Sequence, residues 1–374
     1  MKLEPIALEV WLNENEKDCK YNLAETCCAS ISVRELLTLA GNEKEHLETL
    51  LDLKMTYGAI YGSDALRNSI ASLFEGQTSE NVAVTHGGVG ANALTIMSLV
   101  EHGDRVISAM PNYPQLYCMP QALGADVHFW HLQEDKGWLH SIDELEKLAN
   151  TKTKLICITN PNNPTGALLN DTQLRSIVDI ARGCDAWVLC DESYRGIALA
   201  DGADISSIVD LYEKGVSTGS LSKPYSLAGL RVGWAVGNTG FIAKGNVCRD
   251  YHIISICAIN DYLATLALEN RAQLLLRSSK IVDENVEHLS AWIQSQPKLS
   301  FQPPKGGTAT LVRYAYDLPS VEFCLKLLKE TGVFIVPGSV LGVENTFRLG
   351  CGSDPAQFRL GLELLANWLE HLKQ

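Results

Sequence analysis

The segment Ser220-Leu-Ser-Lys223-Pro-Tyr-Ser-Leu-Ala-Gly229-Leu-Arg231-Val-Gly233 joins an apparent strand to a Gly-rich turn. A lysine considered alone is usually an ordinary surface residue. Here Ser220 precedes the lysine by three positions and Arg231 follows it by eight, so three polar side chains form one cluster. A hydroxyl and an arginine fork suit the oxygens of a phosphate, and a lysine whose pKa is lowered by cationic neighbours and partial burial suits Schiff-base chemistry. The segment therefore predicts a reactive lysine beside an anion site.

The pattern Ser-x-Ser-Lys followed by Gly-Leu-Arg-x-Gly resembles the lysine signature of the class I/II aminotransferases. These are fold-type I enzymes that depend on pyridoxal 5'-phosphate (PLP). The resemblance implies that Lys223 binds PLP through a Schiff base and acts as the catalytic base. It also implies that Ser220, Ser222 and Arg231 bind the cofactor phosphate. Further matches follow in the family's order along nearly the whole chain.

Two polar loops follow apolar segments. In the loop of residues 160–166 (Asn-Pro-Asn-Asn-Pro-Thr-Gly), which is otherwise only rich in turn residues, Asn163 resembles the asparagine that binds O3′ of the cofactor ring. Asp191 ends the next apolar segment, where an aspartate could equally cap a helix. The resemblance implies that Asp191 pairs with the ring nitrogen, that Tyr194 donates to O3′, and that Ser193 lies under the ring. A carboxylate in a low-dielectric site keeps that nitrogen protonated, which makes the ring a better acceptor of electrons from Cα.

The turn Gly87-Gly-Val-Gly-Ala-Asn joins a predicted strand to a predicted helix. Such a turn often serves tight packing alone, but its free N–H groups and the positive end of a helix dipole also suit a phosphate. It resembles the family's phosphate-binding turn, with Gly88, Val89 and Gly90 as the contributing residues. Many family members have a Ser or Thr hydroxyl here, whereas this turn has none. Backbone N–H groups are therefore expected to bind much of the phosphate.

Three more side chains match family positions. Tyr113 resembles the aromatic residue that stacks on the cofactor ring. Tyr57 resembles the tyrosine that crosses a dimer interface to the neighbour's phosphate, with Tyr61 as the alternative. Arg348 resembles the arginine whose planar fork binds the substrate α-carboxylate, and the substrate is expected between Arg348 and Asn163. The resemblance thus implies a homodimer with shared active sites.

Composition excludes several other classes of protein. The net charge of −13, with Lys and Arg scattered along the chain, argues against a nucleic-acid partner. No signal peptide or long apolar run is present, so we expect a cytoplasmic protein that does not enter a membrane. The 11 cysteines include no C-x-x-C pair. We therefore expect them to be reduced thiols that pack as small apolar side chains and bind no metal.

Apolar segments and amphipathic helices alternate through the first two thirds of the chain, which predicts an α/β fold with a mostly parallel sheet. The predicted strands are 82–85, 105–109, 126–131, 155–159 and 187–190, and the predicted helices are 64–74, 87–100, 113–123, 141–149 and 172–182. Helices at 278–295 and 355–372 with strands near 309–314 and 332–336 predict a second, α+β domain. We predict an N-terminal segment (1–49) that joins the small domain, a large PLP-binding domain (50–275) and a C-terminal small domain (276–374).

The resemblance implies an aminotransferase that acts on a small amino acid and a 2-oxo acid through Lys223. The same residues also serve PLP lyases and cyclases, and the Gly-Gly-x-x-Ala-Asn turn is similar to that of the cyclopropane-carboxylate synthases. β- or γ-elimination, or cyclisation of a modified amino acid, is therefore the alternative. A PLP-fold domain kept only as a regulator's effector module is disfavoured, because the catalytic set is complete and the chain has no basic extension.

Overall fold

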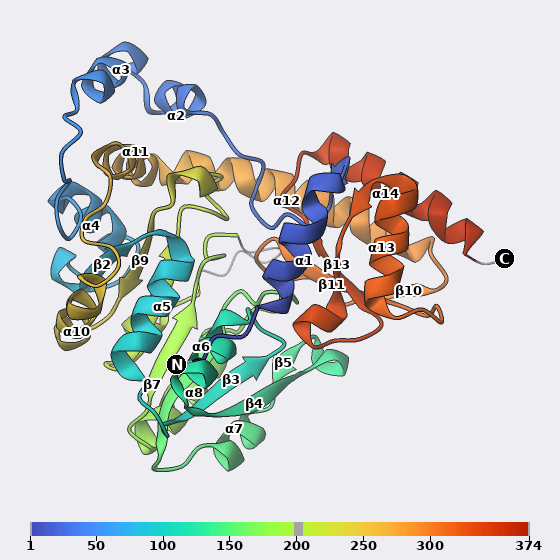
Figure 1. Cartoon of the computed structure of the whole chain (residues 1–374), viewed down its shortest axis with the longest axis horizontal. Helices are drawn as coiled ribbons and strands as arrows, with labels where there is room; N and C mark the ends of the chain where they lie inside the picture. Colours follow the sequence, from blue (N-terminus) through green and yellow to red (C-terminus); the bar gives the residue numbers. More distant parts are fainter. Residues whose placement is uncertain (1, 198–204, 373–374) are drawn as a thin grey trace.

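The computed structural model describes residues 2–197 and 205–372 (Figure 1). Its largest feature is an eight-stranded sheet with the strand order β2-β9-β8-β7-β6-β3-β4-β5. The strands are β2 (Val82–Thr85), β3 (Arg105–Met110), β4 (Asp126–Gln133), β5 (Leu139–His140), β6 (Thr153–Thr159), β7 (Trp187–Asp191), β8 (Gly215–Ser220) and β9 (Gly233–Val236). Strands β8, β7, β6, β3 and β4 run parallel, whereas β9 is antiparallel to both of its neighbours and β5 is antiparallel to β4. The predicted α/β fold with a mostly parallel sheet is confirmed.

Helices cover both faces of this sheet. They are α5 (Gly87–Leu99), α6 (Gln115–Leu123), α7 (Ile142–Leu148), α8 (Asp171–Gly183), α9 (Ile208–Leu211) and α10 (Thr239–Arg249). In β6, Leu155 and Cys157 belong to the core formed with α5, α6 and α10, whereas Ile156 and Ile158 belong to the core formed with α7, α8 and α9. Because each face is buried against helices, the strand carries no polar alternation.

A second, antiparallel sheet with the order β10-β11-β14-β13 lies in the C-terminal part of the chain. Its strands are β10 (Leu299–Phe301), β11 (Ala309–Tyr314), β13 (Val336–Pro337) and β14 (Thr346–Gly350), and its helices are α12 (Arg271–Gln294), α13 (Ser320–Thr331) and α14 (Pro355–His371). The N-terminal helix α1 (Ala7–Asn15) packs here, where Trp11 Nε1 donates to the carbonyl of Ile335 at 3.0 Å. Strand β1 (Tyr21–Asn22) pairs in parallel with β12 (Val333–Phe334).

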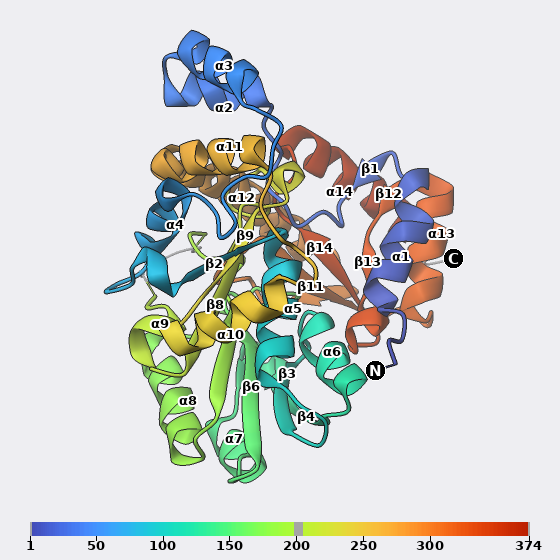
Figure 2. The same ribbon diagram turned by 60° about the vertical axis from the view of Figure 1, so that its left-hand side comes forward.

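The chain then turns back toward the large sheet. Helices α2 (Val33–Ala40) and α3 (Glu43–Asp52) stand out from the body of the molecule, above α11 (Ala258–Glu269) (Figure 2). Leu36 and Leu37 of α2 share a core with α4 (Asp64–Ala71) and α11. The first 49 residues therefore contact both parts of the molecule, and the domain boundaries at 49/50 and 275/276 stay a prediction.

Two helix ends lie several residues from their predicted positions. Helix α12 begins at Arg271 rather than at 278, and α4 ends at Ala71 rather than at 74. Ser141 caps the start of α7: its hydroxyl accepts from the Glu144 N–H, while the Glu144 carboxylate accepts from the His131 N–H. Across the described ranges, no helix combines the length and apolar character needed to cross a bilayer.

Candidate active site

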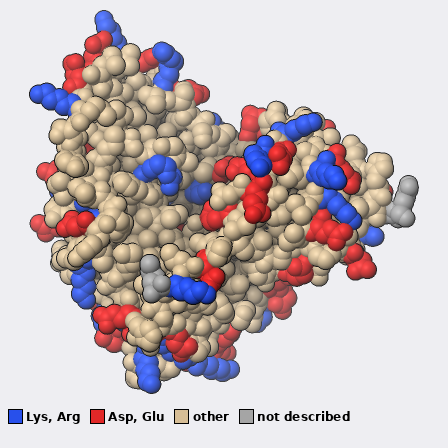
Figure 3. All heavy atoms as spheres, viewed as in Figure 1, with Lys and Arg blue, Asp and Glu red and all other residues tan. Residues whose placement is uncertain are grey.

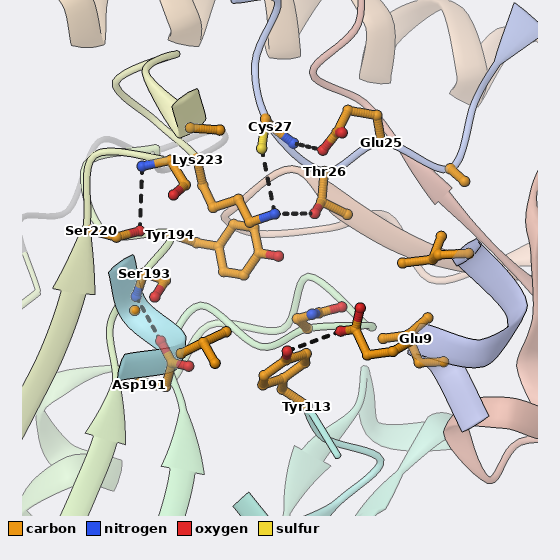
Figure 4. A pocket seen from close by; sticks show the side chains of 18 of the residues that line it. Glu9, Glu25, Thr26, Cys27, Tyr113, Asp191, Ser193, Tyr194, Ser220 and Lys223 are labelled. Carbon is orange, nitrogen blue, oxygen red and sulfur yellow. Dashed lines mark hydrogen bonds between the residues drawn. The ribbon is translucent and has the colours of Figure 1, made fainter. Parts of the chain in front are cut away.

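A cavity of about 310 Å³ opens between the two sheets, above the carboxyl ends of β6, β7 and β8. Ligands bind at this edge of open α/β sheets. Most of the predicted site residues line the cavity, as Figure 4 shows for some of them. They are Gly88, Val89, Tyr113, Asn163, Asp191, Ser193, Tyr194, Ser220, Ser222, Lys223, Arg231 and Arg348.

Lys223 lies just after β8 and extends its amine into the cavity. Its Nζ donates to Thr26 Oγ1 at 2.9 Å and lies 3.5 Å from Cys27 Sγ (Figure 4). The expected lowering of the pKa of Lys223 is wrong for this arrangement. Burial lowers this pKa, but Tyr194, Cys27 and Glu25 raise it by more, so that it ends above its usual value. The sequence could not predict this result, because Cys27 and Glu25 come from a segment almost 200 positions away.

Asp191 ends β7 with both carboxylate oxygens held in place. Oδ1 accepts from the Ser193 N–H at 3.0 Å, and Oδ2 accepts from Asn92 Nδ2 at 2.8 Å. Asn92 is in turn held by the Thr218 hydroxyl, which donates to its Oδ1 at 2.6 Å. A turn rather than a helix follows β7 at residues 193–196, so Asp191 is not a helix cap. Sequence analysis assigned no role to Asn92, although it lies in the Gly-rich turn.

An anion cradle lies at the start of α5. The first N–H groups of a helix have no intrahelical partners and face the positive end of its dipole. Space is tight beside them: a Cβ on Gly88 would lie 3.0 Å from Ser193 Oγ, and a Cβ on Gly87 would lie 2.6 Å from Arg231 Nη2. Glycines therefore bring the Ser193 hydroxyl and the Arg231 guanidinium close to the helix start, as a phosphate requires. Gly90 does not line the cavity.

Arg348 lies on β14 and is 3% exposed. Its Nη1 donates to Asn163 Oδ1 at 3.2 Å and its Nη2 donates to the Ala24 carbonyl at 3.1 Å. Its Nε has no partner among residues 2–197 and 205–372. Burial lowers the pKa of this guanidinium. A buried arginine with an N–H left over at a cavity is suited to bind a carboxylate.

Sequence reasoning missed the N-terminal wall of the cavity. Glu25, Thr26 and Cys27 lie on one side of it, and α1 brings Glu9, whose carboxylate accepts from the Tyr113 hydroxyl at 3.0 Å (Figure 4). The segment that contains these residues carries no motif. Only contacts between distant parts of the chain bring it to the site.

Tyr57 does not reach this cavity within one chain. Its side chain is 75% exposed and lies near His86 and Ser255 in a separate open depression. Its predicted contact with a neighbouring subunit's phosphate stays a prediction. Tyr61, the alternative, is 45% exposed and lies under the guanidinium of Arg249.

Comparison with known proteins identifies the family. Residues 43–365 match the model for aminotransferase class I and II. The chain belongs to this family. It is thus a PLP-dependent enzyme, and the predicted family and cofactor are confirmed. The cavity suits PLP, because one wall offers phosphate donors, another offers a fixed carboxylate, and a lysine amine lies between them.

Some relatives that span nearly the whole chain are named as aminotransferases, and others are named as a synthase or a cyclase. A solved PLP-dependent aminotransferase from Streptococcus suis is 38% identical, with a TM-score of 0.97, and the match covers 100% of both chains. Capreomycidine synthase of Streptomyces vinaceus is 27% identical over 97% of this chain and 93% of its own length. The solved PLP-dependent cyclase OrfR is 26% identical, with a TM-score of 0.91, over 99% of this chain and 98% of its own. Family members of this shape therefore include both aminotransferases and cyclases.

Proposed function

We propose that this PLP-dependent enzyme is an aminotransferase that converts an α-amino acid and a 2-oxo acid, with Lys223 as its Schiff-base lysine. The observation that carries the proposal is that Lys223, Asp191 and Arg348 line one cavity. A mobile base, an anionic partner for the ring and a carboxylate clamp are the parts that a reversible proton shift requires.

The proposed roles divide the cavity into a phosphate end and a ring end. When bound, PLP supplies an aldehyde for the substrate amine and a ring that accepts the electron pair left at Cα. The groups that would hold its phosphate are Gly88, Val89, Ser220, Ser222 and Arg231, with Tyr57 from a second copy of the chain. Asp191 would pair with the ring nitrogen, Tyr113 and Ser193 would lie on the two ring faces, and Asn163 and Tyr194 would bind O3′.

The substrate end depends on Arg348 and Lys223. Arg348 would hold the α-carboxylate with its free Nε and an Nη group, beside Asn163, which fixes where Cα lies. The Lys223 amine, released when the substrate amine takes its place, would remove the Cα proton and deliver it to C4′ of the cofactor. Asp191 would meanwhile stabilise the protonated ring nitrogen, and Asn92 would keep the carboxylate aimed at it.

The fate of the cofactor tests the reaction. We expect holoenzyme given an amino acid but no oxo acid to convert its cofactor to the amine form and to release one oxo acid per site. Absorbance spectra and product analysis by mass spectrometry measure both quantities. Sustained turnover of one amino acid, without an acceptor and with the cofactor unchanged, would contradict the aminotransferase proposal.

A lyase or cyclase is the second candidate. It is supported by capreomycidine synthase and OrfR, whose similarity extends over almost the whole chain rather than over the family core alone. The same Lys223 amine would remove the Cα proton, after which a leaving group would depart from Cβ or Cγ. The experiment above separates this candidate from transamination.

A further inference from the structure

Three carboxylates in the catalytic cavity are not used by the proposed reaction. Glu9, Glu16 and Glu25 all line the cavity, and none of them forms an ion pair with another described residue. Their hydrogen-bond donors are neutral, namely the Tyr113 hydroxyl, the Asn22 amide and the Cys27 N–H. Neutral donors hold a carboxylate in place but leave its charge uncompensated.

The proposed function already assigns a binding partner to each cation of the cavity. Under the proposed function Lys223 binds the cofactor, Arg231 faces the phosphate, and Arg348 faces the substrate α-carboxylate. Burial raises the pKa of Glu25, but Lys223 and the Cys27 N–H lower it by more, so that this carboxylate is ionised at neutral pH. Once the phosphate takes Arg231 and the substrate α-carboxylate takes Arg348 as partner, the side of the cavity opposite the sheet is left with an excess of negative charge.

The N-terminal helix presents this charge together with apolar surface. Leu8 and Leu12 are four positions apart, and Glu9 and Glu16 are seven apart, so these residues share one face of α1 and the turn that follows it. All four line the cavity. Figure 3, in the view of Figure 1, shows Asp and Glu side chains gathered over α1 beside the hollow of the surface.

An independent observation indicates how a ligand is anchored opposite this face. Arg348 is 3% exposed and lines the cavity, and its Nε is without a partner among the described residues. An unsatisfied buried donor of this kind is costly unless a ligand accepts from it. A ligand held there by a carboxylate would extend its side chain along Leu8 and Leu12 toward the acidic groups.

We propose that the substrate is an α-amino acid whose aliphatic side chain ends in a cation, a guanidinium or an ammonium, that Glu9, Glu16 and Glu25 recognise. The proposal rests on the proposed function, because it takes Arg348 as the α-carboxylate clamp. The three carboxylates lie before residue 43, where the match to the family model begins. The residues proposed to select the substrate therefore lie in a segment that the family model does not match.

Titration of the PLP-loaded enzyme with single amino acids tests the proposal, with the cofactor absorption spectrum as the readout of binding. L-arginine and L-lysine are compared with L-citrulline and L-norleucine, which have similar shapes but no side-chain charge. We expect apparent Kd values for the cationic pair to be lower by roughly tenfold or more, as for a charged hydrogen bond. Equal or tighter binding of the neutral pair, or of L-glutamate, would overturn the substrate class while leaving the proposed function intact.

Variants assign the effect to the acidic groups. Glu9→Gln, Glu16→Gln and Glu25→Gln, separately and combined, should raise the Kd for arginine and leave the Kd for norleucine unchanged. Glu14→Gln is the matched control, since Glu14 is on the exposed side of α1 and does not line the cavity. An unchanged preference for arginine in the triple variant would overturn the proposal. A spectrum that responds to no amino acid at all would contradict the proposed function as well.

Discussion

At the scale of single residues, the environment of Lys223 sets what its amine can do. Thr26 and Cys27 hold Nζ at the cavity edge, and Tyr194, Cys27 and Glu25 together keep the pKa of the free amine above its usual value despite burial. Under the proposed function a Schiff base with PLP would occupy this amine until the substrate amine takes its place, and the released amine would then act as the base.

Lys223 is the residue at which PLP should be fixed. Borohydride reduction of the holoenzyme should attach the cofactor covalently to this lysine, as peptide mapping by mass spectrometry would reveal. Lys223→Ala should keep PLP through the phosphate groups but lose turnover by roughly a hundredfold or more, because the base is gone. A labelled peptide containing a different lysine would refute the assignment.

Asp191 should matter for rate more than for cofactor affinity. Asp191→Asn removes the charge that supports the protonated ring nitrogen, and this charge counts most when electrons move from Cα into the ring. We expect kcat to fall by roughly a hundredfold or more, with a small change in the Kd of PLP. Asn92→Ala removes the donor to Asp191 Oδ2 and should lower kcat by a smaller factor. Wild-type kcat in Asp191→Asn would show that another group supports the ring.

The residues that sequence analysis identified and those it missed differ in how they reach the site. Asn163, Asp191 and Lys223 lie at or just after the carboxyl ends of neighbouring parallel strands. The fold therefore brings them to one edge of the sheet, and local motifs suffice to find them. Glu9 and Thr26 lie in a stretch without a motif. Their place depends on contacts such as that of Trp11 with Ile335, 324 positions apart, which no local pattern encodes.

At the scale of elements, the segment after β1 is held by main-chain bonds to the end of β14. The Gly350 N–H donates to the Leu23 carbonyl at 2.8 Å, and the Ala29 N–H donates to the Gly352 carbonyl at 2.7 Å. A Cβ on Gly350 would collide with the carbonyl oxygen of Glu25, and both of these groups are backbone. The close approach of these two segments of main chain therefore brings Glu25 and Thr26 to the cavity.

This docking makes Gly350 a sensitive position. Gly350→Ala should lower the free energy of unfolding by roughly 1–3 kcal/mol, as overpacking does, and should raise the KM for the amino acid by displacing Glu25 and Thr26. Gly183→Ala is the control: a Cβ there meets no atom of the described residues within 4 Å, and alanine is favoured over glycine in a helix. Denaturant unfolding and steady-state kinetics provide the two measurements. A Gly350→Ala enzyme as stable and as active as the control would contradict the close docking.

At the scale of the whole molecule, a surface apolar region remains to be explained. Met55 is 78% exposed and Tyr57 75%, and the chain around them lies against residues 255–257 and His86. Large apolar side chains gathered at one surface indicate an interface with another protein. His86 directly precedes the start of α5, so this surface lies beside the proposed phosphate end of the active site.

A second copy of the chain is the partner that this position favours, because a tyrosine presented from such an interface could reach the neighbour's phosphate. We predict a homodimer by analytical ultracentrifugation at micromolar concentration. Tyr57→Phe removes one hydroxyl donor from the phosphate and should raise the Kd of PLP by roughly three- to tenfold without changing the sedimentation coefficient. Met55→Glu, by contrast, places a charge in the apolar surface and should shift the protein toward monomer with a parallel loss of PLP. Each site would then be complete only in the dimer, and a fully active monomer that retains PLP would refute this arrangement.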